Sequence, residues 1–172
     1  MFLIAFFALL SFSFARFIVS NDTSIKFFAI EENECYQGED GIFRLVLSED
    51  FKTVYVLKGR RCDELTMQTT YTYGFAVTDK IPPYFVKQQM LFTSRSCKSN
   101  PEARDDAWYY PYGCLNFRTF SLNISETENG FQQARFQNNN CVGDPVKVDK
   151  YDYFTCYMRN LTSSEQYIPT DL

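Results

Sequence analysis

The sequence contains no histidine and only one tryptophan among its 172 residues. The missing histidines exclude serine and cysteine triads of the usual type, the common zinc hydrolase sites and imidazole proton transfer near neutral pH. The sequence also has no Cys-x-x-Cys pair, no glycine-rich phosphate loop and no calcium-loop pattern. We therefore predict no metal ion, no cofactor and no catalytic residue, which points away from an enzyme.

Charged residues are spread along the chain and do not form long runs of one sign. The sequence has 17 basic and 21 acidic side chains, and its longest basic cluster is the short one at residues 58–61. Binding to nucleic acid or to an anionic membrane surface would require a denser basic patch. After residue 15, no stretch approaches the ~20 apolar residues of a membrane span. These absences predict no nucleic-acid partner and no membrane span, and they leave the oligomeric state open.

The N-terminal segment differs from the rest of the chain because residues 1–15 carry no charged side chain. Phe, Leu, Ile and Ala dominate this segment, which ends in Ser13-Phe14-Ala15 before Arg16. A short apolar run followed by a small-x-small site is typical of a cleaved signal peptide. A membrane span is the alternative, but the run is too short for one. We therefore predict a signal peptide over residues 1–15 and an extracellular, secreted mature protein.

Three Asn-x-Ser/Thr triplets follow this segment, and none has proline in the middle. In secreted proteins such triplets are acceptors for N-linked glycans and lie on the surface. We predict a glycoprotein that is modified at Asn21, Asn123 and Asn160.

Apolar and polar residues alternate with period two in several segments, whereas helical periodicity is scarce. The alternation is found over residues 43–47, 71–77 and 120–125. Segments with this period that are rich in Tyr, Phe, Val and Thr are typical of half-buried strands. Residues 84–92 also favour a strand, although their Gln and Met residues are compatible with a helix. The predicted fold class is all-β.

A unit made of an apolar strand, a short polar segment and a cysteine recurs along the chain. A polar turn and another strand follow the cysteine, so the unit predicts a β-hairpin with a cysteine at its loop. Four such hairpins would supply about eight strands, enough for a sandwich or a small barrel. The hairpins are expected near residues 25–47, 51–77, 85–124 and 131–158.

The length predicts one domain, because roughly 150 residues can form a single core. We place this β domain at residues 16–158. The recurring unit indicates an internal duplication, with two halves near residues 16–80 and 85–158. Residues 159–172 end in polar side chains and are expected to form a flexible C-terminal tail.

The six cysteines predict three disulfides, because they follow a signal peptide. The step along the chain from Cys35 to Cys62 is equal to the step from Cys114 to Cys141. Each member of the second pair therefore follows its counterpart in the first pair by the same offset. This repetition predicts that each pair forms one disulfide.

The same offset relates Cys97 to Ile18 and Cys156 to Val77. Both remaining cysteines therefore have β-branched aliphatic counterparts, as if one cross-link had been replaced by an apolar contact. This correspondence predicts that the two cysteines are bonded to each other. The complete predicted set is Cys35–Cys62, Cys114–Cys141 and Cys97–Cys156.

One aromatic segment precedes Cys114, and its Pro111 and Gly113 indicate a turn. Exposed rigid rings give a large contact area at low entropic cost, so such a loop suits a glycan or protein ligand. The alternative is that these rings belong to the core. The predicted binding residues are Trp108, Tyr109, Tyr110 and Tyr112.

These features together predict a secreted non-enzymatic interaction protein that binds a glycan or a cell-surface protein through the aromatic loop. A carrier of a small apolar ligand is one alternative, because about eight aromatic-rich strands can close into a β-barrel with a cavity. A hydrolase is another, since paired carboxylates can cleave glycosides. The candidate pairs are Asp105/Asp106, Glu126/Glu128 and Asp149/Asp152.

Overall fold

A computed structural model describes residues 15–21 and 26–170 of the chain. The predicted signal peptide lies outside the described residues except for Ala15. Strands dominate the described part, which contains no α-helix and one short 3-10 turn, η1 (Asn139–Cys141). The prediction of an all-β fold is confirmed. Within the same ranges, no helix is long and apolar enough to cross a membrane.

The described residues form fifteen strands, more than expected, because each predicted hairpin contains three or four strands and two further strands lie outside the hairpins. Eleven strands belong to one large, branched sheet and four to a smaller sheet. The large sheet consists of β1 (Phe17–Ser20), β2 (Phe27–Glu31), β3 (Cys35–Gly38), β4 (Gly41–Leu47), β5 (Val54–Gly59), β6 (Thr66–Tyr71), β7 (Phe75–Thr78), β8 (Val86–Leu91), β9 (Arg104–Tyr110), β14 (Tyr157–Met158) and β15 (Ser164–Pro169). The smaller sheet consists of β10 (Cys114–Asn116), β11 (Ser121–Glu126), β12 (Gly130–Phe136) and β13 (Lys147–Asp152).

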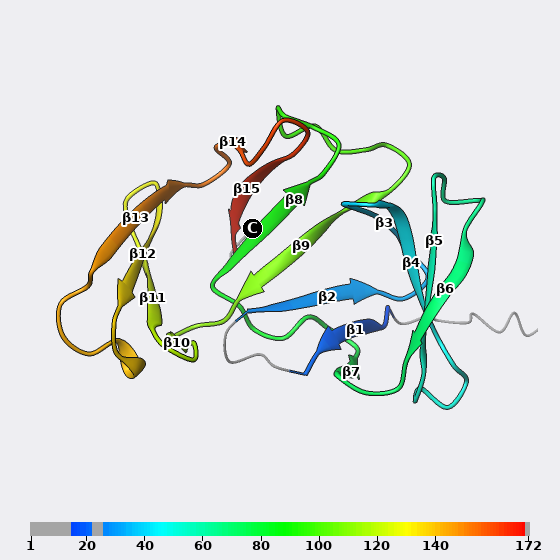
Figure 1. The fold of residues 1–172 in the computed structure, drawn as a ribbon, viewed down its shortest axis with the longest axis horizontal. Coiled ribbons are helices and arrows are strands. Elements are labelled where there is room, and N and C mark those ends of the chain that lie inside the picture. Colours follow the sequence, from blue (N-terminus) through cyan, green and yellow to red (C-terminus); the bar gives the residue numbers. More distant parts are fainter. Residues whose placement is uncertain (1–14, 22–25, 171–172) are drawn as a thin grey trace, which may run out of the picture.

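Strand β9 is the branch point of the large sheet. One of its edges pairs with β8, which continues to β15 and β14. The other edge pairs with β3 in parallel at Arg104 and Asp105, and with β2 in antiparallel at Trp108 and Tyr109. One branch continues as β3-β4-β5-β6 and the other as β2-β1-β7. Both branches lie at the right of Figure 1.

The two branches pack their apolar faces against each other in a sandwich-like arrangement. Ile18 and Ile30 of one branch share a core with Leu45 and Val56 of the other. Alternate residues of each strand supply this face because successive side chains point to opposite sides of a sheet. Each fully buried aliphatic side chain stabilises the fold by roughly 1.5–3 kcal/mol. The sheets do not close into a barrel, so the structure favours the sandwich among the two predicted architectures.

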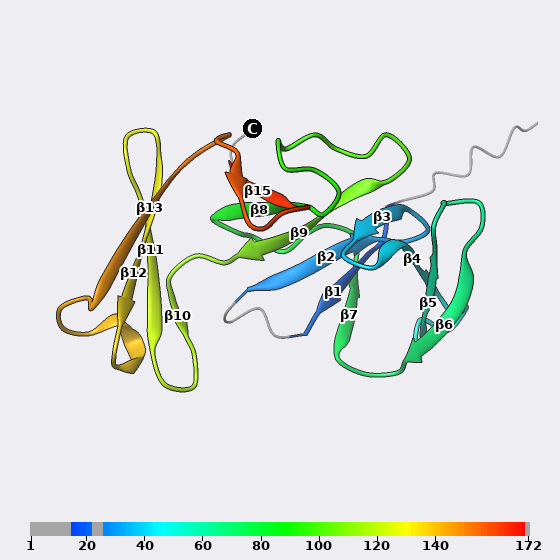
Figure 2. The same cartoon turned by 45° about the horizontal axis from the view of Figure 1, so that its top comes forward.

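Strands β3–β6 and β10–β13 have the same antiparallel order, and we call them the first and the second meander. Cys35 is opposite Arg44 in the first meander, and Cys114 is opposite Asn123 in the second, so the partners are related by the same offset as the cysteines. The two meanders lie at opposite ends of the molecule (Figures 1 and 2). This shared register supports the internal duplication that the cysteine spacing indicates.

The structure contains the three disulfides that the spacing predicts. In each meander, one disulfide joins the first residue of the first strand to the loop after the third strand. The third disulfide links the loop between β8 and β9 to the segment just before β14. The bonds are Cys35–Cys62, Cys114–Cys141 and Cys97–Cys156.

The aliphatic counterparts of the third disulfide are also in contact. Ile18 and Val77 lie directly opposite each other in the β1–β7 pair. Cys97 has a φ of 51° and lies outside any strand, so its segment does not reproduce β1. The two offset-related pairs are therefore each in contact, one as paired strand residues and the other as a disulfide.

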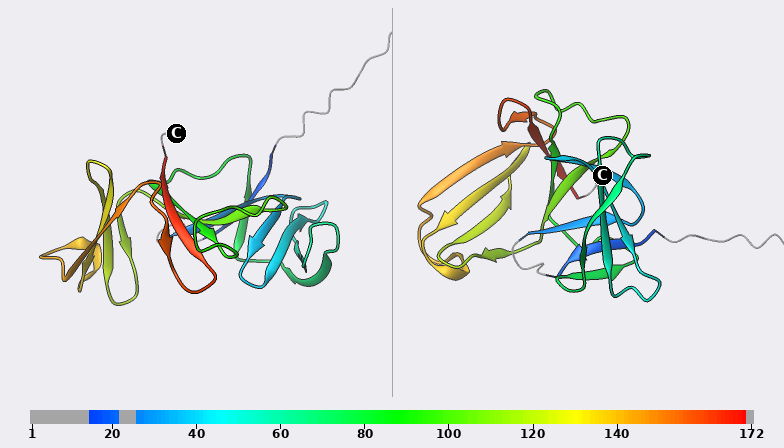
Figure 3. Two further views of the ribbon diagram at one scale, coloured as in Figure 1. Left: turned by 90° about the horizontal axis from the view of Figure 1, so that it is seen from above. Right: turned by 45° about the vertical axis from the view of Figure 1, so that its right-hand side comes forward.

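The C-terminal segment is a strand and not the flexible tail that its sequence suggests. Strand β15 pairs with β8 along its whole length, and its Ser164 and Tyr167 are buried. Figure 3 shows β15 in the middle of the molecule, between the two meanders. This segment belongs to the fold because the Tyr167 ring enters an aromatic cluster around Phe131.

The predicted strand over residues 71–77 is divided into two. Strand β6 ends at Tyr71 and β7 begins at Phe75, and Gly74 between them has a φ of 83°. Glycine adopts this left-handed conformation without steric cost. The chain uses the break to pass from one branch of the large sheet to the other.

Candidate functional site

A cleft of about 810 Å³ lies between the two branches of the large sheet. Apolar side chains form both of its walls. The wall from β1, β2 and β7 consists of Ile18, Phe28, Ile30 and Phe75. The facing wall from β4 and β5 consists of Phe43, Leu45, Val54 and Val56. Small-molecule sites are typically concave, mostly apolar and ~300–1,000 Å³ in volume, so the cleft has the size and polarity of such a site.

The floor of the cleft is one face of the β8–β9 pair. Gln88 is opposite Trp108 and Met90 is opposite Asp106, which places the four side chains on the same face. Trp108 is half-buried and packs edge-on against Phe28, with ring centroids 6.1 Å apart. The only indole of the chain is therefore positioned to contact a bound ligand.

The mouth of the cleft is open to solvent. Tyr73 and Tyr71 stand at this edge and are 84% and 52% exposed. Glu39, Asp40 and Lys58 are also exposed there. Three of the six charged side chains that line the cleft thus lie at its rim, whereas its two walls are apolar.

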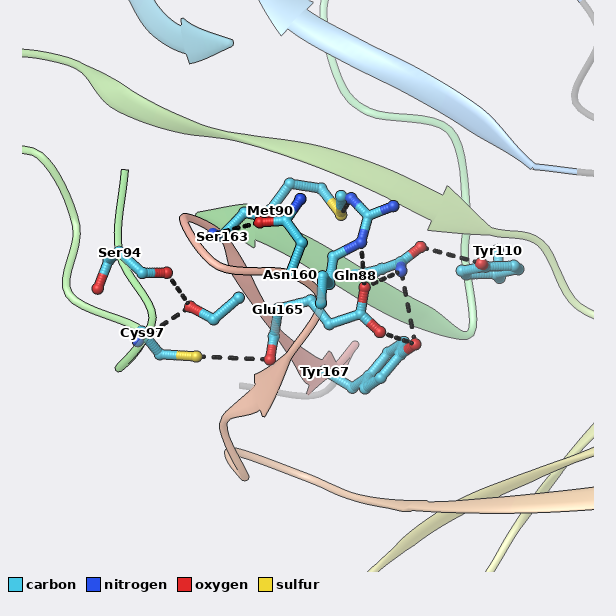
Figure 4. A network of polar contacts seen from close by, with 11 residues as sticks. Gln88, Met90, Ser94, Cys97, Tyr110, Asn160, Ser163, Glu165 and Tyr167 are labelled. Atoms are coloured by element: carbon cyan, nitrogen blue, oxygen red, sulfur yellow. Dashed lines mark hydrogen bonds and ion pairs between the residues drawn. The ribbon is translucent and has the colours of Figure 1, made fainter. Parts of the chain in front are cut away.

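A polar network joins β8, β9 and β15 around Gln88, a residue of the cleft floor (Figure 4). The Tyr110 hydroxyl donates to Gln88 Oε1 at 3.0 Å, and Gln88 Nε2 donates to Glu165 Oε2 at 2.9 Å. The Tyr167 hydroxyl donates to Glu165 Oε1, also at 2.9 Å. A hydrogen bond to a charged group contributes about 1.5–3 kcal/mol to the stability of the fold. These contacts therefore hold β8, β9 and β15 together at this end of the cleft.

The tyrosines of this network remain neutral donors. Burial raises the pKa of Tyr110 to about 12, and the nearby Glu165 carboxylate acts in the same direction. Burial and Glu165 also raise the pKa of Tyr167 well above its usual range. Neither hydroxyl ionises near neutral pH, so the network adds no negative charge beyond that of Glu165.

Two cations line the same end of the cleft. Lys26 Nζ lies 4.5 Å from the ring centroid of Trp108 and 5.9 Å from that of Tyr110. Arg159 Nε pairs with Glu165 at 3.2 Å. Burial lowers the pKa of Lys26, Arg159 lowers it further, and Glu165 raises it. Two cations and one carboxylate leave a net positive charge at this end.

Asp106 is the acidic group of the floor. Its carboxylate accepts the amide N–H of Ala107 at 2.8 Å and has no cationic partner in the part of the chain that the structure describes. Burial raises the pKa of Asp106 to about 6, and the hydrogen bond from Ala107 acts in the opposite direction. Asp106 therefore changes charge in weakly acidic solution.

The neighbouring Asp105 does not form an acid pair with Asp106, because adjacent residues of a strand face opposite sides of the sheet. Asp105 accepts a hydrogen bond from Gln89 Nε2 at 2.6 Å on the face away from the cleft. Among the other predicted acids, Asp149 forms an ion pair with Lys147 at 2.7 Å. The remaining ones, Asp152, Glu126 and Glu128, are exposed. The cleft thus contains only one of the six candidate acids of the hydrolase alternative.

The four predicted aromatic binding residues do not share one surface. The expected loop is the end of strand β9, whose alternation separates neighbouring rings. Trp108 lies in the cleft, whereas Tyr109 points to the opposite face and stacks on Phe27 with centroids 5.4 Å apart. Tyr110 is buried in the network, and Tyr112, beyond the strand, is 61% exposed. Of these four residues, only Trp108 faces the cleft.

The predicted glycosylation sites differ in exposure. Asn21 and Asn160 are exposed, and Asn123 is half-buried in β11. Asn160 Oδ1 accepts hydrogen bonds from the backbone N–H and the hydroxyl of Thr162, at 2.8 and 3.2 Å. Modification of these residues stays a prediction.

A second hollow, of about 500 Å³, lies on the opposite face of β9. Three of its charged groups already have partners, whereas Lys87 forms no ion pair within the described residues. Arg104 forms ion pairs with Glu31 and Glu34, and Asp105 accepts a hydrogen bond from Gln89. The larger cleft, with its greater volume and its two apolar walls, is the better candidate site.

No protein-family model, no curated protein and no solved structure matches this chain. Within the described residues, no group of three or more His, Cys, Asp or Glu side chains could hold a metal ion. The function of the cleft must therefore be argued from its shape and chemistry.

Proposed function

We propose that the protein is a non-enzymatic binding protein that holds a small apolar ligand in the cleft. The observation that carries this proposal is the pair of facing apolar walls, which leave about 810 Å³ between them. Each Å² of apolar surface removed from water contributes about 25 cal/mol to the free energy of binding, so these walls favour an apolar ligand. Among the predicted functions this is the carrier, with the ligand between two branches of a sheet and not inside a barrel.

Recognition of a glycan or a surface protein by an aromatic loop has less support. Tyr109 and Tyr110 are buried and make their contacts within the protein. Trp108 is the one member of the predicted set that a ligand in the cleft would touch.

The proposed carrier acts outside the cell. Its three disulfides support this location, because disulfides persist in oxidising compartments. We propose that the chain is secreted after removal of residues 1–15 and carries glycans at Asn21, Asn123 and Asn160. Peptide mapping of the protein from its native source tests both modifications.

Filling the cleft tests the binding proposal. Val54 is opposite Tyr71 in the first meander, and Phe131 is opposite Tyr151 in the second. The variant Val54→Phe therefore places a phenylalanine ring in the cleft wall, as the second meander has at its corresponding position. The neutral fluorophore N-phenyl-1-naphthylamine brightens in apolar sites and serves as the probe. We expect the wild-type chain to bind it and Val54→Phe to bind it at least about tenfold more weakly, a loss of about 1.4 kcal/mol.

A matched control is Val148→Phe, which makes the same change at a residue of the second meander that is 44% exposed. We expect this variant to bind the probe like the wild type. Circular dichroism and urea unfolding establish that all three proteins are folded. Equal affinity of the wild type and a folded Val54→Phe variant would contradict the proposal.

A further inference from the structure

The charges around the cleft indicate which kind of apolar ligand it accepts. Lys26 is half-buried, and its ammonium contacts the faces of two aromatic rings. In the described part of the chain, no carboxylate lies within ion-pair distance of Lys26. Partial burial of a cation is costly when no anion pairs with it. A ligand that brings an anion to this point would remove that cost.

The nearest carboxylate cannot fill this role. Glu165 is engaged by Arg159 at 3.2 Å, by Gln88 at 2.9 Å and by Tyr167 at 2.9 Å. Its oxygens are therefore committed to the network, and one positive charge remains uncompensated. The aspartate of the floor, Asp106, forms no ion pair within the described residues.

Arg159 adds to the same positive end. Its Nη1 lies 3.6 Å from the sulfur of Met90, a residue of the floor, so the guanidinium extends over the cleft while its Nε holds Glu165. A cationic ligand would be repelled by both side chains. A neutral ligand would leave the Lys26 charge without a partner.

We propose that the ligand is a single-chain amphiphile whose one anionic group pairs with Lys26, beside Arg159, while its apolar chain lies between the two walls. This inference rests on the proposed function. A carboxylate and a sulfate or phosphate monoester offer the same chemistry at this point.

Isothermal titration calorimetry with three decyl probes tests the inference on the full mature chain. The probes are decanoate, 1-decanol and decyltrimethylammonium, each below its micellar concentration, so the chain is constant and only the head group changes. We expect the wild type to bind decanoate at least about tenfold more tightly than 1-decanol and to bind the ammonium compound most weakly.

Two variants separate charge from packing. Lys26→Met keeps an apolar stem of similar length and removes the charge. The affinity of this variant for decanoate should therefore fall to its affinity for 1-decanol. Its affinity for 1-decanol should differ from that of the wild type by less than about twofold. Lys150→Met, an exposed residue of β13, changes the net charge equally and should leave all three affinities as in the wild type.

The results distinguish the two proposals. Equal affinities for decanoate and 1-decanol in the wild type would overturn the anionic head group and leave the carrier intact. If Lys26→Met lost affinity for decanoate and for 1-decanol equally, the anionic head group would also be overturned, because Lys26 would then act by packing. If 1-decanol bound the wild type no better than it bound Val54→Phe, the proposed function itself would fail. Repeating the titration with decyl sulfate and decyl phosphate identifies the preferred anion.

Discussion

The two meanders share their strand order and the register of their first strand pair, yet the first borders an open cleft and the second a filled core. Val54 and Phe131 occupy equivalent positions, opposite Tyr71 and Tyr151. Phe131 is completely buried and stacks on Tyr151, with centroids 5.3 Å apart. Tyr71, opposite the smaller valine, is 52% exposed. The comparison teaches that one framework can hold either a solid or a hollow interior, depending on the size of a few inward-facing side chains.

The outer strands of the two meanders differ as well. Strand β6 has no charged residue and is exposed along its whole length. Strand β13, at the same place in the second meander, carries two lysines and two aspartates. Charges on an edge strand discourage pairing with other chains. The second meander therefore has this protection, whereas the uncharged strand of the first lies beside the mouth of the cleft.

The largest expected effect comes from emptying the filled core. Phe131→Ala should lower the free energy of unfolding by about 3–5 kcal/mol, because it leaves a cavity among the surrounding rings. Val54→Ala should cost only about 1–2 kcal/mol, since it removes two buried methyl groups and not a whole aromatic ring. Urea unfolding of both variants measures the difference. Similar losses would show that the two interiors are equally well packed, contrary to the comparison.

The next prediction concerns the disulfide that links the loop between β8 and β9 to the segment before β14. Cys97→Ala/Cys156→Ala opens a cross-link with a sequence separation of 59 and should cost up to about 4 kcal/mol by the chain-entropy estimate. Cys35→Ala/Cys62→Ala, with a separation of 27, should cost about 3.5 kcal/mol by the same estimate. Urea unfolding under non-reducing conditions measures both. An unchanged stability after loss of the first bond would mean that β14 and β15 are held by their pairing with β8 alone.

A pH series examines the cleft without disturbing the filled core. Because burial raises the pKa of Asp106 to about 6, the folded chain binds the proton more tightly than the unfolded chain does. This contribution is complete below about pH 4 and is lost as the pH rises through about 6. It amounts to at most about 3 kcal/mol.

Asp106→Asn removes that titration and keeps an acceptor for the Ala107 amide. The free energy of unfolding of the wild type, minus that of the variant, should fall between about pH 4 and pH 6. The buried tyrosines of the network do not contribute in this range, since the pKa of Tyr110 is raised to about 12. A difference that stays constant with pH would place Asp106 in contact with solvent and not with the floor of the cleft.

The smallest expected effect is at the mouth of the cleft. Tyr71→Ala should change the free energy of unfolding by less than about 0.5 kcal/mol, because the ring is largely exposed. Its equivalent, Tyr151→Ala, should cost about 2 kcal/mol or more, since that ring contacts Phe131, Tyr157 and Tyr167. Thermal unfolding suffices for this pair. A large loss in Tyr71→Ala would show that the mouth of the cleft is part of the core.

Local pattern predicted much of this fold. Alternation identified strands at residues 43–47 and 120–125, and residues 84–92 contain β8 as expected. It did not reveal the end of β6, because the break at Gly74 follows from a change of sheet branch that no local periodicity reports. It also did not show β15, whose polar and apolar residues become a strand only through pairing with β8.

The candidate site was less accessible to sequence reasoning. Trp108 is recognisable in the sequence because it is the only tryptophan. The neighbouring tyrosines are predicted to bind with it only because they are adjacent to it along the chain. Strand alternation sends Tyr109 to the other face, and burial removes Tyr110. Lys26 and Arg159 gave no signal at all, since they lie near opposite ends of the chain and only folding brings both to one end of the cleft.

Periodicity and cysteine spacing are properties of the chain, and they are enough to predict the all-β class and the three disulfides. The tertiary structure decided that β9 pairs with β2 and β3 along one edge, and this branching separates the two apolar walls. Strand pairing between distant segments depends on which edges remain free after the other strands have paired. For that physical reason, the cleft and its positive end exist only in the folded molecule.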